Sequence, residues 1–188
     1  MKKLGYLVVA ALLLGGCSYK NEAISLESYK ANYAGKKSKD HKTVSIGLVK
    51  DTRIDKRSIG HLLNNNQKTV ALYSDVNFAD KFNEGLGYAL NIAGFNTDVT
   101  SSSASMIMEV YIKDINIVYN DKSFDKNLEG EMDVQVIIKR GDKISTLNFK
   151  QKSGKWISPS YNSKDIEPFL CKLFSDSIND IVSKLTTL

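Results

Sequence analysis

Apolar residues alternate with polar ones along several stretches of the chain, as they do in β-strands that have one buried face. The clearest stretches flank Arg140-Gly141-Asp142, a tight turn in which glycine allows a positive φ. Along Met106 to Tyr119 the apolar positions change parity after Lys113-Asp114. This change predicts a bulge, because one extra residue re-aims every side chain that follows. The predicted strands are residues 43–49, 69–73, 106–119, 132–138 and 143–150.

A spacing of three and four residues, typical of an amphipathic helix, follows the second predicted strand. Its apolar stripe runs from Phe78 to Ala93. Ser74 or Asp75 is the expected cap, since a side-chain oxygen there accepts an unpaired backbone N–H. Gly85 and Gly87 inside the stripe lower helix propensity, and we expect close packing against the sheet as the reason.

A second apolar stripe predicts a helix from about Asp165 to Leu185, with Pro168 in its first turn. The predicted order is therefore strand, strand, helix, three strands, helix. The hairpins of the second half favour antiparallel pairing. We predict an α+β domain with a mostly antiparallel sheet of about five strands and two helices packed on one face.

The first residues have the parts of a secretory signal: Met1-Lys2-Lys3, an apolar run from Leu4 to Leu14, and small residues before Cys17. The run is too short to span a bilayer, which takes about 20 residues as a helix. Leu14-Gly15-Gly16-Cys17 resembles the bacterial lipobox. The resemblance implies cleavage after residue 16 and a diacylglycerol thioether on Cys17, whereas an ordinary secretory signal would leave this cysteine unmodified. Ser18 after the cysteine implies sorting to the outer membrane of a Gram-negative cell.

Residues 17–42 are mostly polar and end in a lysine-rich run, so we interpret them as a lipidated tether with a possible short strand at Ala23 to Leu26. A single periplasmic domain is predicted for residues 43–188. Once Cys17 is acylated, Cys171 is the only other cysteine, and an internal disulfide is excluded. Cys171 is expected to be a small buried residue of the last helix.

The formal net charge is +5, but basic residues are interspersed with acidic ones rather than gathered in the stripe that nucleic acid would need. The two histidines, His41 and His61, are not at metal-ligand spacing from other ligands. Glu129 and Glu131 alternate with apolar strand residues and are expected to face water. With no nucleophile or phosphate-binding motif, we predict no metal, no cofactor and no enzymatic activity.

The connection from Lys50 to Gln67 is long for a link between two strands, and long loops are often functional. We predict that it is a partner-binding loop with a mixed-charge contact surface. Arg53 either binds a carboxylate or phosphate of a ligand, or pairs with Asp51 and fixes the loop; the pattern favours the second. The candidate contact residues are Asp51, Arg53, Asp55, Arg57 and His61.

The stretch from Val44 to Arg53, followed by Asp55, Ile59-Gly60 and later Ala93-Gly94-Phe95, resembles the YajG-like family of small bacterial lipoproteins. The resemblance extends over nearly the whole chain. It implies a lipoprotein without an established activity, so it supplies no catalytic residues.

Three functions are compatible with these patterns. The first is a non-enzymatic scaffold or adaptor in an envelope complex, held to membrane lipid through Cys17 and bound to an envelope protein. The second is a regulator of a peptidoglycan synthase. The third is a carrier of small hydrophobic envelope molecules, which needs an apolar groove between sheet and helices.

Overall fold

The computed structural model describes residues 23–40, 42–123, 125–159 and 162–188. The predicted signal segment and Cys17 lie outside these residues. In chain order, the elements of the described part are β1 (Val44–Asp51), β2 (Ser58–Asn64), β3 (Gln67–Tyr73), α2 (Phe78–Ile92), β4 (Met106–Asn120), β5 (Leu128–Arg140), β6 (Lys143–Lys155) and α3 (Ser163–Leu185).

The strands form one sheet in the order β3-β2-β4-β5-β6. β1 also pairs with β4, in parallel, along Met106 to Ile112, and β2 pairs in parallel with Ile117 to Asn120 of the same strand. The β2–β3, β4–β5 and β5–β6 pairs are antiparallel. The predicted α+β class with a mostly antiparallel sheet is confirmed, and the described sheet has six strands because β2 adds one to the predicted five.

The predicted turn and bulge are both present. Gly141 has a φ of 55° in the β5–β6 turn, a left-handed conformation that glycine adopts without a steric penalty. The β4–β5 register shifts between Ile112 and Asp114, so Lys113 is the extra residue. The shift returns Ile115 and Ile117 to the buried face of the sheet.

The prediction missed β2, which lies inside the stretch interpreted as one long loop. Asn65 and Asn66 have φ values of 52° and 62° and join β2 to β3. Two successive residues with positive φ make the tight turn that suits the twist of a hairpin, and asparagine tolerates it. The Asn64-Asn65-Asn66 run was therefore a hairpin signal.

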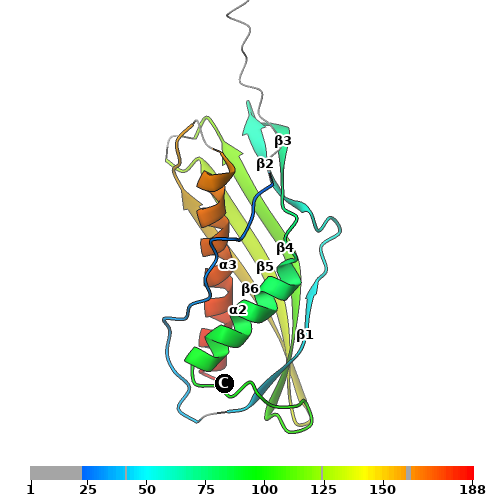
Figure 1. Ribbon diagram of the computed structural model, residues 1–188. Coiled ribbons are helices and arrows are strands. Elements are labelled where there is room, and N and C mark those ends of the chain that lie inside the picture. Colours follow the sequence, from blue (N-terminus) through cyan, green and yellow to red (C-terminus); the bar gives the residue numbers. More distant parts are fainter. Residues whose placement is uncertain (1–22, 41, 124, 160–161) are drawn as a thin grey trace, which may run out of the picture.

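Both helices cover the same face of the sheet, as Figure 1 shows. The cap of α2 is Asn77, whose side chain accepts the N–H of Asp80, rather than the predicted Ser74 or Asp75. α3 begins after Asn162, which forms a capping box with Asp165. Pro168 is the sixth residue of α3, beyond the predicted first turn, where the missing N–H leaves one backbone acceptor without its usual helical donor.

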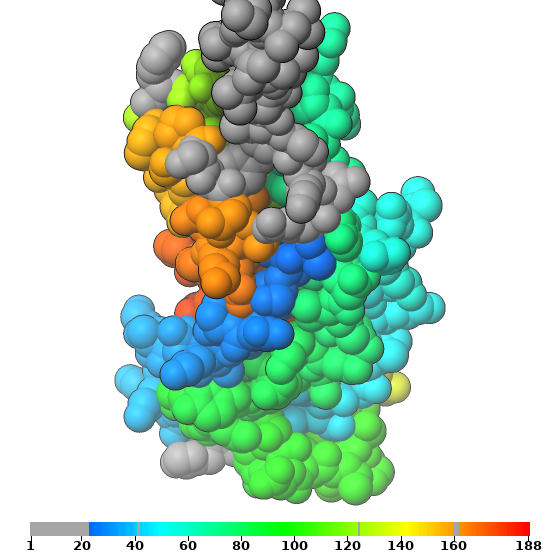
Figure 2. All heavy atoms as spheres, turned by 45° about the horizontal axis from the view of Figure 1, so that its top comes forward, coloured from blue at the N-terminus to red at the C-terminus, as the bar shows by residue number. Residues whose placement is uncertain are grey.

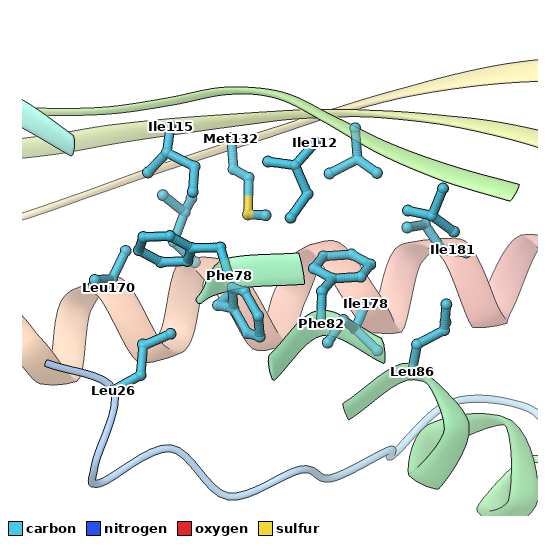
Figure 3. Packing of buried hydrophobic residues seen from close by; sticks show 14 of the residues in the cluster. Leu26, Phe78, Phe82, Leu86, Ile112, Ile115, Met132, Leu170, Ile178 and Ile181 are labelled. Atoms are coloured by element: carbon cyan, nitrogen blue, oxygen red, sulfur yellow. The ribbon is translucent and has the colours of Figure 1, made fainter. Parts of the chain in front are cut away.

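The core lies between the sheet and the helices. Phe78 and Phe82 of α2 point into it beside Ile112, Met132 and Ile178, and Figure 3 shows these side chains filling the layer. The ring of Phe174 on α3 packs edge-on against Phe82, with centroids 5.2 Å apart. Such aromatic contacts add to the free energy gained by burying apolar area.

The segment from Ala23 to Asp40, hereafter the N-terminal strap, packs along the outer side of the two helices (Figures 1 and 2). Ala23 forms a parallel bridge to Tyr73 of β3, and Ile24 and Leu26 are buried. Near the other end, the N–H of Ser38 donates to the carbonyl of Ala93 at 2.6 Å. The predicted tether is wrong for residues 23–33, because Ile24, Leu26 and Tyr33 contribute side chains to the core. The lysine-rich run that follows is exposed at Lys36, Lys37 and Lys39.

The strap also explains Gly85 of α2. A Cβ at this position would lie 2.3 Å from the Tyr29 hydroxyl and 2.8 Å from Cδ1 of Ile178. The close packing predicted for Gly85 is present, but its neighbours are the strap and α3 rather than the sheet. The prediction is wrong for Gly87, where a Cβ would meet only Cδ1 of Ile46, at 3.9 Å. In the described part of the chain, neither helix has the length and hydropathy that membrane crossing requires.

Candidate partner-binding loop

The stretch predicted as a loop from Lys50 to Gln67 contains a much shorter one. β1 ends at Asp51 and β2 begins at Ser58, so residues 52–57 form the connection, hereafter the Ile54 loop. It projects from the side of the sheet in Figures 1 and 2, in cyan. The prediction of a long loop is wrong because β2 occupies its second half.

A buried ion pair fixes the base of this loop. Nη2 of Arg53 lies 2.7 Å from Oδ2 of Asp51, and Nε donates to both carboxylate oxygens. Both residues are only 7 % exposed. The guanidinium also donates to the carbonyls of Ser58 (2.7 Å) and Lys56 (2.6 Å) and stacks over the ring of Phe78.

The Nε, Nη1 and Nη2 groups of Arg53 therefore all donate to acceptors within the protein. A planar guanidinium with two parallel hydrogen bonds to one carboxylate holds both partners in fixed geometry. Of the two interpretations of this residue, the structure shows the one in which Asp51 and Arg53 fix the loop. They do not contribute to the exposed surface predicted for them.

Asp55 and Arg57 shape the outer part of the loop. Oδ1 of Asp55 accepts the backbone N–H groups of Arg57 (3.0 Å) and Ser58 (3.2 Å), which is an Asx-type turn. Arg57 pairs with Asp75 at 2.8 Å and stacks over the ring of Tyr73. Both ends of the Arg57–Asp75 pair are exposed, so it contributes little to stability but leaves both charges on the surface.

Ile54 lies at the tip of the loop with its side chain fully exposed, at 106 % of the reference area. The loop that carries it is fixed at its base by the buried ion pair and in its outer part by Asp55. A single exposed isoleucine is common on protein surfaces and does not by itself indicate a binding site. Here it is presented in a defined position beside Asp55 and Lys56, and the sequence prediction missed it because it considered only charged residues.

A hollow lies on each side of the Ile54 loop, and each has a volume of about 470 Å³. The first is bounded by the end of β1 and the start of α2, with Lys56 and Asp75 on its walls. The second is bounded by the bulge of β4 and by His61 and Lys68. Charged side chains thus surround the apolar tip on both sides.

His61 is not in a loop, as predicted, but on β2 opposite Ala71 of β3. Partial burial lowers the pKa of His61, and the positive charge of Lys68 lowers it further. The imidazole is therefore predominantly neutral near pH 7. It borders the second hollow and remains a candidate contact residue.

The sequence predicts no functional role for Glu131 and Cys171, and both have structural partners. Glu131 lies on the open face of the sheet, where hydrogen bonds from Lys150 and Lys152 hold the pKa of its carboxyl below the usual range. Burial raises the pKa of the Cys171 thiol, whose sulfur lies 3.5 Å from Oγ of Ser28. A raised pKa keeps a thiol protonated and weakly nucleophilic. No group of three His, Cys, Asp or Glu side chains that could hold a metal ion occurs within the described residues.

Comparison with known proteins decides the family. A family model named Lipoprotein_16 and described as "Uncharacterized lipoprotein" matches residues 30–184. The chain belongs to this lipoprotein family. The resemblance to YajG-like lipoproteins seen in the sequence is thereby confirmed. The Lipoprotein_16 match begins inside the strap, so the family pattern includes part of the segment that had been predicted to be a tether.

No curated protein matches the chain, but solved structures share the Lipoprotein_16 fold. The protein XCC0632 from Xanthomonas campestris, of the DUF330 family, superposes with a TM-score of 0.51 and 9 % identity, over 84 % of this chain and 91 % of that one. A second structure, of an uncharacterized protein, gives 0.53 and 8 %, over 81 % and 99 %. At these identities the likeness concerns the fold alone.

Proposed function

We propose that this lipoprotein is anchored in the outer membrane through Cys17 and acts in the periplasm as a non-enzymatic adaptor that binds another envelope protein through the Ile54 loop. The observation that carries the proposal is the fixed, fully exposed Ile54 between two charged hollows. Interfaces with an apolar centre and a polar rim are typical of protein–protein contacts.

Rigidity of the loop favours binding. Association costs conformational entropy when a mobile loop must be ordered, and a loop already fixed avoids most of that cost. Arg53 and Asp51 supply this fixation without using any exposed group. The partner surface that fits is an apolar depression that receives Ile54. Its border carries a positive charge opposite Asp55 and negative charges opposite Lys56 and Arg57.

The carrier alternative has less support. It needs an apolar groove between sheet and helices, and that layer is filled by Phe78, Phe82 and their neighbours (Figure 3). The two hollows beside the Ile54 loop open on the surface and include charged side chains. Polar groups supply about half or more of both linings, whereas a lipid or small-molecule site is mostly apolar.

The test is site-specific photo-crosslinking in living cells, with the photoreactive residue at position 54. The control is the same residue at Ile144, which is 68 % exposed on β6. We expect one dominant adduct at position 54 and none at position 144. Equal adducts at both positions, or none at position 54, would contradict the proposal, and the identity of the adduct separates an adaptor from a regulator of a peptidoglycan synthase.

A substitution provides the second test. Ile54→Asp leaves the fold unchanged, because the native side chain has no buried contact to lose. Co-purification of the crosslinked partner should fall at least tenfold, whereas Ile144→Asp should retain it. Undiminished co-purification with Ile54→Asp removes the loop as the interface.

A further inference from the structure

The length of chain between the anchor and the fold restricts how the domain can lie against the membrane. Cys17 is six positions before Ala23, the first residue that the structure places. Fully extended, six residues reach about 20 Å, at roughly 3.3–3.6 Å each. The lipid surface therefore lies within that distance of Ala23, given the lipid anchor of the proposed function.

The sheet is long compared with this reach. Ala23 pairs with Tyr73, which lies opposite Ser58 of β2. Through the β2–β4 register, that level corresponds to about Ile115 of β4. From there to Met106, where β4 begins, the strand extends about 30 Å at about 3.3 Å per residue. A membrane at the β5–β6 turn would thus be out of reach, whereas the other end of the sheet is within it.

That nearer end has side chains suited to lipid. The Trp156 end, as we call it, consists of Asn65, Lys122, Lys126, Asn127 and Trp156. Trp156 directly follows β6 and is 55 % exposed. Tryptophan favours the boundary between lipid head groups and acyl chains, because its ring is apolar and its N–H is a donor. Lysine chains can extend along such a boundary to reach phosphates.

A buried pair of hydrogen bonds fixes the position of Trp156 at this end. Asn127 is buried and brackets Ile157, accepting its N–H and donating to its carbonyl, both at 2.7 Å. The position of Trp156 is thereby fixed relative to the start of β5. Across the end, the ammonium of Lys122 donates to the side chain of Asn65 in the β2–β3 turn. The backbone position of Trp156 is therefore set by the fold and does not depend on lipid.

We propose that the Trp156 end rests on the lipid surface, so that the domain stands end-on with Trp156 inserted among the head groups. Asp121 and Asp125 directly precede Lys122 and Lys126, so the contact depends on the indole more than on net charge. The inference rests on the proposed lipid anchor but not on the Ile54 loop. It adds a second, direct contact of the folded domain with the membrane.

Trp156 is the only tryptophan of the chain and is therefore its own reporter. The lipidated full-length protein is reconstituted into vesicles of phosphatidylethanolamine and phosphatidylglycerol, with acyl chains either plain or brominated. Bromine quenches an indole at short range only. We expect brominated vesicles to remove most of the Trp156 emission and to shift the remainder to shorter wavelength.

The matched control moves the reporter to the opposite end of the domain. The double variant Trp156→Phe/Tyr88→Trp places it near the end of α2, where Asn96 bridges to Thr43 just before β1. Tyr88 is 52 % exposed, so the larger ring fits there. This variant should show no quenching.

Flotation of the vesicles separates the two hypotheses. Protein that floats, with Trp156 emission equal in plain and brominated vesicles, overturns the end-on contact and leaves the anchor intact. Equal quenching of both reporters also overturns it, because the domain would then lie on its side. Protein that does not float overturns the lipid anchor and the contact that depends on it.

Discussion

Arg53 and Asp51 are two positions apart on the chain and form a bidentate, almost completely buried ion pair at the base of the Ile54 loop. Loss of one partner leaves the other charge buried and unpaired, which typically costs about 3–5 kcal/mol. We therefore expect Arg53→Ala to lower the free energy of unfolding by this amount, measured by urea denaturation of residues 23–188. The double variant Asp51→Leu/Arg53→Met, without an orphaned charge, should lose less; a larger loss would contradict this account of the pair.

Gly130 of β5 lies under the ring of Phe169, and a Cβ there would be 2.6 Å from Cε1 of that ring. The ring is buried in α3, so Gly130→Ala should overpack the core and cost about 1–3 kcal/mol in thermal denaturation. Gly154→Ala is the control, because its Cβ would meet the flexible Lys126 side chain. The combination of Gly130→Ala with Phe169→Leu should recover stability. Equal melting temperatures for Gly130→Ala and Gly154→Ala would show that β5 can move away from the ring.

Phe174 joins both helices and the strap, with ring centroids 5.0 Å from Tyr29 and 5.2 Å from Phe82. Phe174→Ala should cost about 3–5 kcal/mol, the usual range for a buried aromatic. Lys172→Ala, two residues earlier on the exposed side, should change stability by less than about 0.5 kcal/mol. Calorimetry on the same preparation decides, and similar melting temperatures for the two variants would place α3 outside the core.

The N-terminal strap should be required for full stability. Ile24 and Leu26 are buried, and a fully buried side chain of this size contributes about 1.5–3 kcal/mol. A chain starting at Thr43 should therefore melt well below one starting at Ala23. In the longer chain, Leu26→Ala should cause part of this decrease in melting temperature. Glu27→Ala, at the exposed neighbouring residue, should cause none. If truncation at Thr43 leaves the melting temperature unchanged, the strap is an appendage.

Alkaline pH provides a test of the same interface. Burial of the Tyr29 hydroxyl, together with the nearby charge of Glu84, raises the pKa of Tyr29 to about 12, from 10.0. The unfolded chain then loses this proton at lower pH than the folded chain does, so stability is retained below pH 10 and falls between pH 10 and 12. Melting temperatures across this window should fall less steeply in Tyr29→Phe than in the native protein. An identical slope would assign the alkaline loss to other groups.

The regular elements could be predicted because each has a long periodic stretch of apolar residues. α3 has ten buried positions, and β5 alternates along its whole length, so no other structure fits them. β2 was missed because Gly60 and His61 interrupt its few apolar residues, which therefore show no regular period. The strap was missed for a similar reason: its three buried side chains, Ile24, Leu26 and Tyr33, are too far apart in a polar segment to show a period.

The roles of the residues in the Ile54 loop could not be predicted for a different reason. The sequence places Asp51 and Arg53 two residues apart, but that spacing suits both a ligand-binding pair and a structural one. The choice depends on what surrounds the guanidinium, namely Phe78 and the carbonyls of Lys56 and Ser58, which come from the fold. Ile54 could not be singled out because nothing in the sequence says that an isoleucine will lack neighbours.

Two strands pair along the same edge of β4: β1 before the bulge at Lys113 and β2 after it. The β4–β5–β6 meander can form from contacts close along the chain, whereas β1 and β2 must return over more than 50 residues, a separation that slows pairing. We expect the meander to form first and the Ile54 loop last, when both strands have docked on β4. Pulse-labelled hydrogen exchange would show late protection of Thr52, whose N–H bonds to Ile112. A partner that recognises the loop would then bind only molecules that have finished folding.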